Sequence, residues 1–258
     1  MRKLAIFAVT TFVLAIAAVA YAQTTNTYTV TGSTSPTKAG TKKKPVPVQV
    51  KFGYTVGTTN GNRPSPVMKY SIRFAGLAVN TKPFPKCSAD TLENQGPAGC
   101  PSGSAVGNGF IQNQTGNRSN PQDKSIQCNA ALTVYNSGNN RAVIYVAGDP
   151  SQTDPRRKCA IELAAPIPAR FIRASGGSAT ALEFTVPQTL LHPLPTLDNA
   201  VVSVTSTIKK ITRRVGKRRV GFFESTGGCV RNRRNITVTF TPESGTAGRA
   251  QRLAPCRR

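Results

Sequence analysis

Hydrophobic and polar residues alternate along most of the chain. In residues 46–56, VPVQVKFGYTV, valine and aromatic side chains fall at every second position, and residues 67–79, VMKYSIRFAGLAV, follow the same pattern. A period of two predicts β-strands with one buried face. Further strands are expected where β-branched and aromatic residues concentrate, in residues 130–136, 142–148, 159–167, 179–186, 200–208 and 236–241.

Turn-forming residues separate these runs, and helical periodicity is nearly absent after the N-terminal segment. The chain has 22 Gly and 19 Pro, and most lie between the expected strands, where they favour turns. Residues 137–140, SGNN, predict a hairpin turn, and residues 88–93 predict a single helical turn. Many short strands joined by turns predict an all-β fold, an antiparallel β-sandwich of immunoglobulin-like or jelly-roll-like topology stabilised by disulfides.

The composition divides the chain into three parts, residues 1–22, 23–45 and 46–258. Residues 23–45 are rich in Thr and Ser and carry Lys42 to Lys44 near their end, which is typical of a flexible arm, although Tyr28 to Val30 suit an edge strand. Residues 46–258 contain no internal repeat, and we expect them to form a single β-sandwich domain. Residues 187–196, PQTLLHPLPT, are expected to be a surface crossover between strands.

Residues 1–22 have the layout of a secretory signal peptide. Arg2 and Lys3 precede an uncharged apolar run, and Ala20-Tyr21-Ala22 supplies the small residues that signal peptidase requires. A transmembrane anchor is the alternative, but the apolar run is at the lower limit of length for a bilayer span. We therefore expect cleavage after Ala22, no transmembrane segment in the cleaved chain, and a protein that is secreted or associated with the cell envelope.

All six cysteines follow the expected cleavage point, and an even number in an exported chain predicts disulfides. A zinc site is not expected, because the chain has no C-x-x-C pair and only one histidine. No metal or other cofactor is therefore predicted. Sequence alone allows many pairings, and we predict the sequential one, Cys87–Cys100, Cys128–Cys159 and Cys229–Cys256.

Residue types that catalytic sites need are scarce. The single histidine, His192, lies in a proline-flanked loop, and ten acidic residues are scattered from Asp90 to Glu243. No G-x-S-x-G motif is present, and GCPSGSAVGNGF (99–110) lacks the Gly-Lys-Ser/Thr ending of a phosphate loop. We expect no enzyme. The alternative is a carbohydrate-active or other hydrolase on a β-sandwich, which would need two carboxylates about 5–9 Å apart in a groove.

Positive charge is the strongest chemical feature of the chain. It has 34 basic and 10 acidic residues, and loss of Arg2 and Lys3 with the signal peptide would leave 32 basic residues. The segment KKITRRVGKRRVGFF (209–223) predicts a hairpin with Gly216 and Lys217 at its tip. We expect its candidate binding residues to be Lys209, Lys210, Arg213, Arg214, Lys217, Arg218 and Arg219.

In this hairpin Arg214 is expected opposite Arg219, with Ile211 and Phe222 at the base. Like charges directly opposite each other are destabilising, which favours an anionic partner. The alternative is that Lys and Arg only keep an edge hairpin soluble and unpaired. Specific nucleic acid recognition is not expected, because no helix is available to enter a groove and only Phe222 and Phe223 could stack on bases.

Four segments occur in an order that resembles a group of uncharacterised secreted actinobacterial proteins: TVTGSTSPTKAGTKKKP (29–45), YSIRFAGLAVN (70–80), PKC with GCPSGSAVGNG (85–87 and 99–109), and GFFESTGGC (221–229). The resemblance covers nearly the whole chain after the expected cleavage point. It implies export and a disulfide-bonded β domain, and it brings no site residues.

Together these features predict a secreted, strongly basic, non-enzymatic protein that associates with anionic cell-wall or extracellular polymers. A purely structural envelope protein, whose charge only aids solubility, is a further alternative.

Overall fold

Almost all regular structure in the described chain is antiparallel β, which confirms the all-β prediction. The computed structural model describes residues 25–173 and 179–257, so the expected signal peptide, residues 1–22, lies outside the described residues. Eleven of the described strands follow one another in a single sheet, in the order β1 (Asn26–Ser35), β3 (Gln49–Thr58), β12 (Leu197–Ile208), β6 (Ala105–Asn117), β8 (Ala130–Gly138), β9 (Arg141–Gly148), β10 (Leu163–Arg173), β11 (Ala179–Thr185), β4 (Val67–Ala75), β16 (Arg233–Pro242) and β17 (Gly248–Pro255). A twelfth strand, β7 (Ile126–Gln127), pairs with β6.

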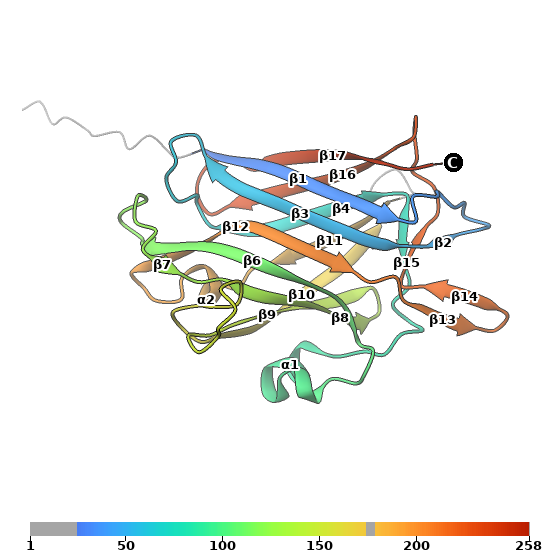
Figure 1. Ribbon diagram of the computed structural model, residues 1–258, viewed down its shortest axis with the longest axis horizontal. Coiled ribbons are helices and arrows are strands. Elements are labelled where there is room, and N and C mark those ends of the chain that lie inside the picture. Colours follow the sequence, from blue (N-terminus) through green and yellow to red (C-terminus); the bar gives the residue numbers. More distant parts are fainter. Residues whose placement is uncertain (1–24, 174–178, 258) are drawn as a thin grey trace, which may run out of the picture.

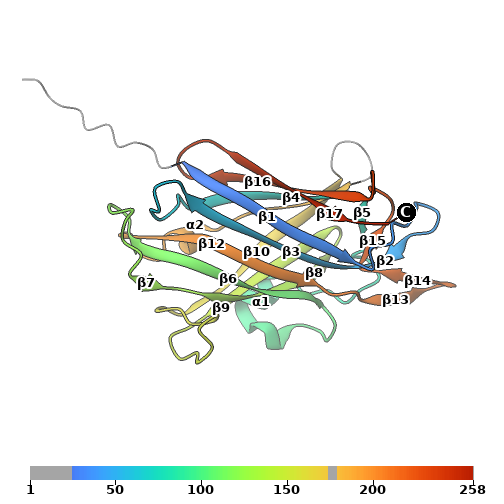
Figure 2. The same ribbon diagram turned by 45° about the horizontal axis from the view of Figure 1, so that its top comes forward.

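This sheet curves until its first and last strands, β1 and β17, lie side by side (Figures 1 and 2). The Tyr28 ring of β1 covers Gly248 of β17, where a Cβ atom would collide with it. Tyr28 also stacks on Phe240 of β16, with ring centroids 4.2 Å apart. The sheet is therefore barrel-like, and its two ends meet through side-chain packing.

The prediction of a β-sandwich is not confirmed, because the main strands continue in one sheet and do not divide into two stacked sheets. Alternating residues show that a strand buries one face. They do not show whether that face meets a second sheet or the far side of the same curved sheet.

Residues 23–45 were predicted to be a flexible arm with a short edge strand. In the structure, residues 26–35 of this segment form the full strand β1. β1 pairs with β3 over its full length, from Asn26 opposite Thr58 to Ser35 opposite Gln49. Its composition hides this role because several inward positions, beside Tyr28 and Val30, hold small or polar residues. Gly32, for example, leaves room for Ile236 of β16, which would lie 2.6 Å from a Cβ atom at that position.

Smaller elements mark the two ends of the barrel-like sheet (Figure 1). One end carries the hairpin of β13 (Thr212–Val215) and β14 (Arg218–Gly221), beside a small sheet of β2 (Val46–Pro47), β15 (Phe223–Ser225) and β5 (Leu77–Val79). The other end carries the short helix α2 (Gln188–Leu191). We call these the hairpin end and the α2 end.

Residues 187–196 were predicted to be a surface crossover between strands. This prediction needs correction, since Leu190 and Leu191 are buried. A second helix, α1 (Ala89–Gln95), and the 3₁₀ turn η1 (Pro97–Gly99) lie outside the sheet. Ser88 caps α1 by accepting a hydrogen bond from the Thr91 amide, as expected for a helical turn at this point.

The three sequential disulfides are confirmed: Cys87–Cys100, Cys128–Cys159 and Cys229–Cys256. The first encloses α1 and η1, a segment with a single buried apolar side chain of its own, Leu92. The third joins the connection before β16 to the residue after β17. Each bridge stabilises the fold mainly by restricting the unfolded chain.

Candidate functional site

The basic hairpin has the predicted register. Val215 pairs with Arg218, Arg214 with Arg219, and Arg213 with Val220. Gly216 has a φ of 58° at the first tip position, which is the backbone conformation that a type II′ turn demands there. Arg214 and Arg219 therefore do stand opposite each other, and all seven basic residues from Lys209 to Arg219 are exposed.

The base of the hairpin is anchored in the protein interior. The Phe222 amide donates to the Ile211 carbonyl at 3.0 Å, and the Phe222 side chain is fully buried. Glu224, also buried, accepts hydrogen bonds from the Gly221 amide and from the Asn80 side chain. Because the base of the hairpin is fixed, its basic side chains can bind a partner without the entropic cost of ordering the backbone.

Further exposed basic residues surround the hairpin at the same end. β1 and β17 finish there and β2 and β16 begin there, so the strand ends bring together Lys38, Lys42, Lys43, Lys44, Arg231, Arg233 and Arg257. The base of the hairpin packs against β2, which follows the Lys42–Lys44 segment, since Gly221 lies against Pro47.

Acidic residues are segregated to the opposite end. Six of the chain's ten lie in connections or strand termini at the α2 end: Asp123, Asp149, Asp154, Glu162, Asp198 and Glu243. Among the described residues, Glu224 is the acid at the base of the hairpin, and its Oε1 atom lies 4.0 Å from Arg218. The fold thus concentrates positive charge at one end to a degree that the sequence order does not reveal.

Phe222 and Phe223 are not available to stack on bases. Both are buried, with 0% and 2% of their surface exposed. They pack edge to face with each other and with Phe171, and this cluster lies in the interior at the hairpin end.

Tertiary structure also builds a cluster that the sequence did not predict, around His192. Its Nε2 atom is in hydrogen-bond contact with Glu243 Oε1 at 2.9 Å. Its Nδ1 atom lies 2.9 Å from Asp198 Oδ1, although not in the alignment of a hydrogen bond. The buried guanidinium of Arg63 lies 3.5 Å from the other oxygen of Asp198.

These residues border a polar surface pocket of about 540 Å³, lined among others by Arg63, Arg118, Asp198 and Glu243. The acidic residues were expected to be scattered, but Asp198 and Glu243 come together at His192. The sequence does not reveal this because the three residues lie on separate elements. No local signal in the sequence links Glu243 to the other two. In the cluster, each ring nitrogen of His192 faces a carboxylate, so the imidazole is held in place with neither nitrogen turned to the pocket.

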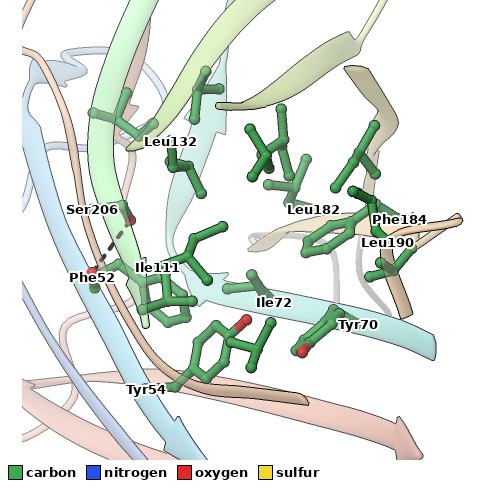
Figure 3. Close-up of a pocket in the computed structure, with 18 of the residues that line it drawn as sticks. Phe52, Tyr54, Tyr70, Ile72, Ile111, Leu132, Leu182, Phe184, Leu190 and Ser206 are labelled. Atoms are coloured by element: carbon green, nitrogen blue, oxygen red, sulfur yellow. Dashed lines mark hydrogen bonds between the residues drawn. The ribbon is translucent and has the colours of Figure 1, made fainter. Parts of the chain in front are cut away.

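A second cavity, of about 110 Å³, lies inside the barrel-like sheet (Figure 3). Its walls come from β3, β4, β6, β8, β9, β10, β11 and β12, and α2 contributes Leu190 and Leu191. No Lys, Arg, Asp, Glu or His is among the described residues that line it. An empty apolar cavity costs roughly 24 cal/mol per Å³, so a void of this volume would cost about 3 kcal/mol.

A few polar groups interrupt the apolar wall. Ser206 donates to the Phe52 carbonyl, and Asn199 is held by Thr115 and the Leu190 carbonyl. Two other lining residues keep polar atoms without a hydrogen bond, the Tyr70 hydroxyl and Asn113 Oδ1.

Tyr70 lies next to Tyr54, with ring centroids 5.4 Å apart, but their hydroxyls do not complete a hydrogen bond of normal geometry. Burial raises the pKa of the Tyr70 hydroxyl and that of the Tyr54 hydroxyl well above their usual value. Both are therefore neutral at physiological pH. An unmatched buried polar atom costs about 1–3 kcal/mol, so Tyr70 and Asn113 are places where a partner would stabilise the fold.

Comparisons with protein families, with curated proteins and with solved structures find no match to this chain. None of the helices in the described ranges is both long and apolar enough to cross a bilayer.

Proposed function

We propose that the chain is an exported, non-enzymatic binding protein that associates with anionic cell-wall or extracellular polymers through its hairpin end. The observation that carries this proposal is the opposition of Arg214 and Arg219 across an exposed hairpin. Two guanidinium groups repel each other in this position, and a polyanion bound across both strands would relieve the repulsion.

The surroundings of the hairpin support the same proposal. A polymer is longer than one hairpin, and the Lys42–Lys44 loop and the chain's C-terminal end extend the positive surface. Acids are concentrated at the far end, so the field of the molecule would orient it toward a polyanion. Binding of this kind recognises charge density and not sequence or shape, which agrees with the burial of Phe222 and Phe223.

The test compares two variants with the same net charge. In the first, Arg213, Arg214, Arg218 and Arg219 are replaced by glutamine. In the second, four exposed basic residues away from the hairpin end, Lys124, Arg157, Lys158 and Arg249, are replaced by glutamine. Residues 23–258 of each protein are applied to immobilised dextran sulfate and to a cell-wall fraction over a salt series.

We expect the hairpin variant to elute at markedly lower salt than the unmodified protein, and the control to elute close to it. Equal losses in both variants would reduce the effect to net charge and contradict the role of the hairpin. Absence of retention of the unmodified protein at low salt would contradict the function itself and favour the purely structural alternative.

A second candidate function, a hydrolase, rests on the cluster of His192, Asp198 and Glu243 beside the polar pocket. We rank it below the first because both ring nitrogens of His192 face carboxylates. Its test is hydrolysis of ester and glycoside substrates by the unmodified protein and by the Glu243→Gln variant. Activity that Glu243→Gln abolishes while polymer retention persists would replace the non-enzymatic proposal.

A further inference from the structure

We propose that the cavity inside the barrel-like sheet is a binding site for a small, uncharged, mainly apolar molecule that carries one hydroxyl group. The site is separate from the hairpin end and does not depend on the function proposed for it.

The size and the walls of the cavity set the class of ligand. Its volume is about 110 Å³, and a cavity of roughly 150 Å³ lined by aliphatic and aromatic side chains accepts benzene while staying free of water. Ile72, Ile111, Leu132, Leu182 and Phe184 point toward this common space (Figure 3). A ligand of about the size of a single ring or a short alkyl chain fits such a space.

The absence of charge in the described lining excludes ions from this class. A carboxylate or an ammonium group would enter without a counter-charge, and burial of an unpaired charge is strongly unfavourable. The two tyrosines at the wall provide no counter-charge, because their hydroxyls stay neutral.

The unmatched polar atoms define the single polar group of the ligand. Asn113 Oδ1 can only accept a hydrogen bond, whereas the Tyr70 hydroxyl can donate or accept. A ligand hydroxyl can satisfy either atom, since it both donates and accepts. A carbonyl could satisfy Tyr70 but not Asn113, so a hydroxyl is the group that matches both.

Apolar side chains line the cavity at both of its ends. Phe171 and Phe223 line it toward the hairpin end, and Leu190 and Leu191 of α2 line it toward the other. α2 has only four residues, so it is the smaller barrier and the place where a ligand would enter. An apolar site of this kind selects its ligand by shape and by one hydrogen bond.

The test uses benzene and phenol as probes, with residues 23–258 and NMR methyl shifts and the thermal midpoint as readouts. We expect both probes to shift the methyl signals of lining residues such as Ile111 and Leu132 saturably and to raise the midpoint. Phenol should bind roughly three- to tenfold more tightly, as one added hydrogen bond predicts.

Two variants and two controls assign the effect to the cavity. Val134→Phe fills the space and should abolish binding of both probes, with Val134→Leu as the smaller change if the phenylalanine prevents folding. Leu253→Phe, on the exposed side of β17, should not affect binding. The double variant Tyr70→Phe/Asn113→Leu should bind benzene but lose the preference for phenol.

Tyr28→Phe is the matched control for the hydroxyl, because the Tyr28 hydroxyl is also buried without a partner but does not line the cavity. A phenol preference that survives the double variant, or that Tyr28→Phe removes equally, would overturn the assignment of the polar group. Failure of benzene to bind saturably, or binding that both Val134 variants leave unchanged, would overturn the site.

Discussion

His192 Nε2 lies 2.9 Å from Glu243 Oε1, and this contact joins the end of α2 to the segment that follows β16. The two residues are 51 positions apart in sequence. Because α2 lines one end of the interior without strand pairing, the contact fixes a segment that the ladder of the sheet does not hold.

Replacement of His192 by leucine should therefore loosen α2 and leave Glu243 without its partner. We expect a loss of about 1–3 kcal/mol in the free energy of unfolding, measured by urea denaturation, and faster hydrogen exchange at the Leu191 and His192 amides. Glu93→Gln, at an exposed position on α1, is the control and should change neither quantity. Unchanged exchange in His192→Leu would show that the apolar side chains alone hold α2.

The charge repulsion across the hairpin gives a prediction that needs no ligand. Arg214→Glu would place a carboxylate opposite Arg219, and an opposite-charge cross-strand pair contributes about 0.2–1 kcal/mol. Hydrogen exchange of the hairpin amides should slow by a corresponding factor. Arg213→Glu makes the same change in net charge opposite Val220, and equal slowing in this variant would contradict the cross-strand explanation.

Arg234 is a cation with no exposed surface. It donates to the Ala75 carbonyl and to the Ser225 hydroxyl, at 2.7 and 2.6 Å, and burial lowers its pKa to about 10. Lysine cannot reproduce these two forked donors, so Arg234→Lys should cost about 1–3 kcal/mol in urea denaturation. The neighbouring Arg233 is exposed, and Arg233→Lys should cost almost nothing; equal costs would refute the role of the fork.

Asp123 should make stability depend on pH in the acid range. Its carboxylate accepts hydrogen bonds from the Asn117 amide and then from Ser125, which lowers its pKa from 3.8 to about 2. A pKa lowered by folding means that this stabilisation is fully present above pH 3.8 and is lost as the pH falls toward 2. Asp123→Asn should therefore be less stable than the unmodified protein at pH 5, and the two should converge near pH 2. A constant difference across this range would contradict the assignment.

The Cys229–Cys256 disulfide holds β17, which pairs with β16 on one side and meets β1 through side chains on the other. Replacement of both cysteines by alanine should lower the free energy of unfolding by about 2–4 kcal/mol and speed hydrogen exchange in β17. Exchange in β8 and β9, on the opposite side of the sheet, is the internal control. Uniform acceleration in all three strands would show that the bridge stabilises the whole fold and not β17 in particular.

The sequence by itself determined most of the strands, several turns and the hairpin, but it did not indicate β6 or β17. Alternating residues placed β3 and β4, and Gly216 with Lys217 at the tip predicted the register of β13 and β14. These features depend on neighbours along the chain, whose chemistry is visible in the sequence. The sequential disulfides were also predicted, because each joins cysteines that are close in the chain.

Only the tertiary structure decided how the sheet closes and what it encloses. Packing of Tyr28 over Gly248 brings the first and last strands together, and nothing local in the sequence marks these two residues as a pair. The same applies to the contact of His192 with Glu243 and to the shared cavity that Tyr70 and Asn113 line. Strand alternation fixes which side chains point inward, but the curvature of the sheet decides which of them meet and whether they fill the space between them.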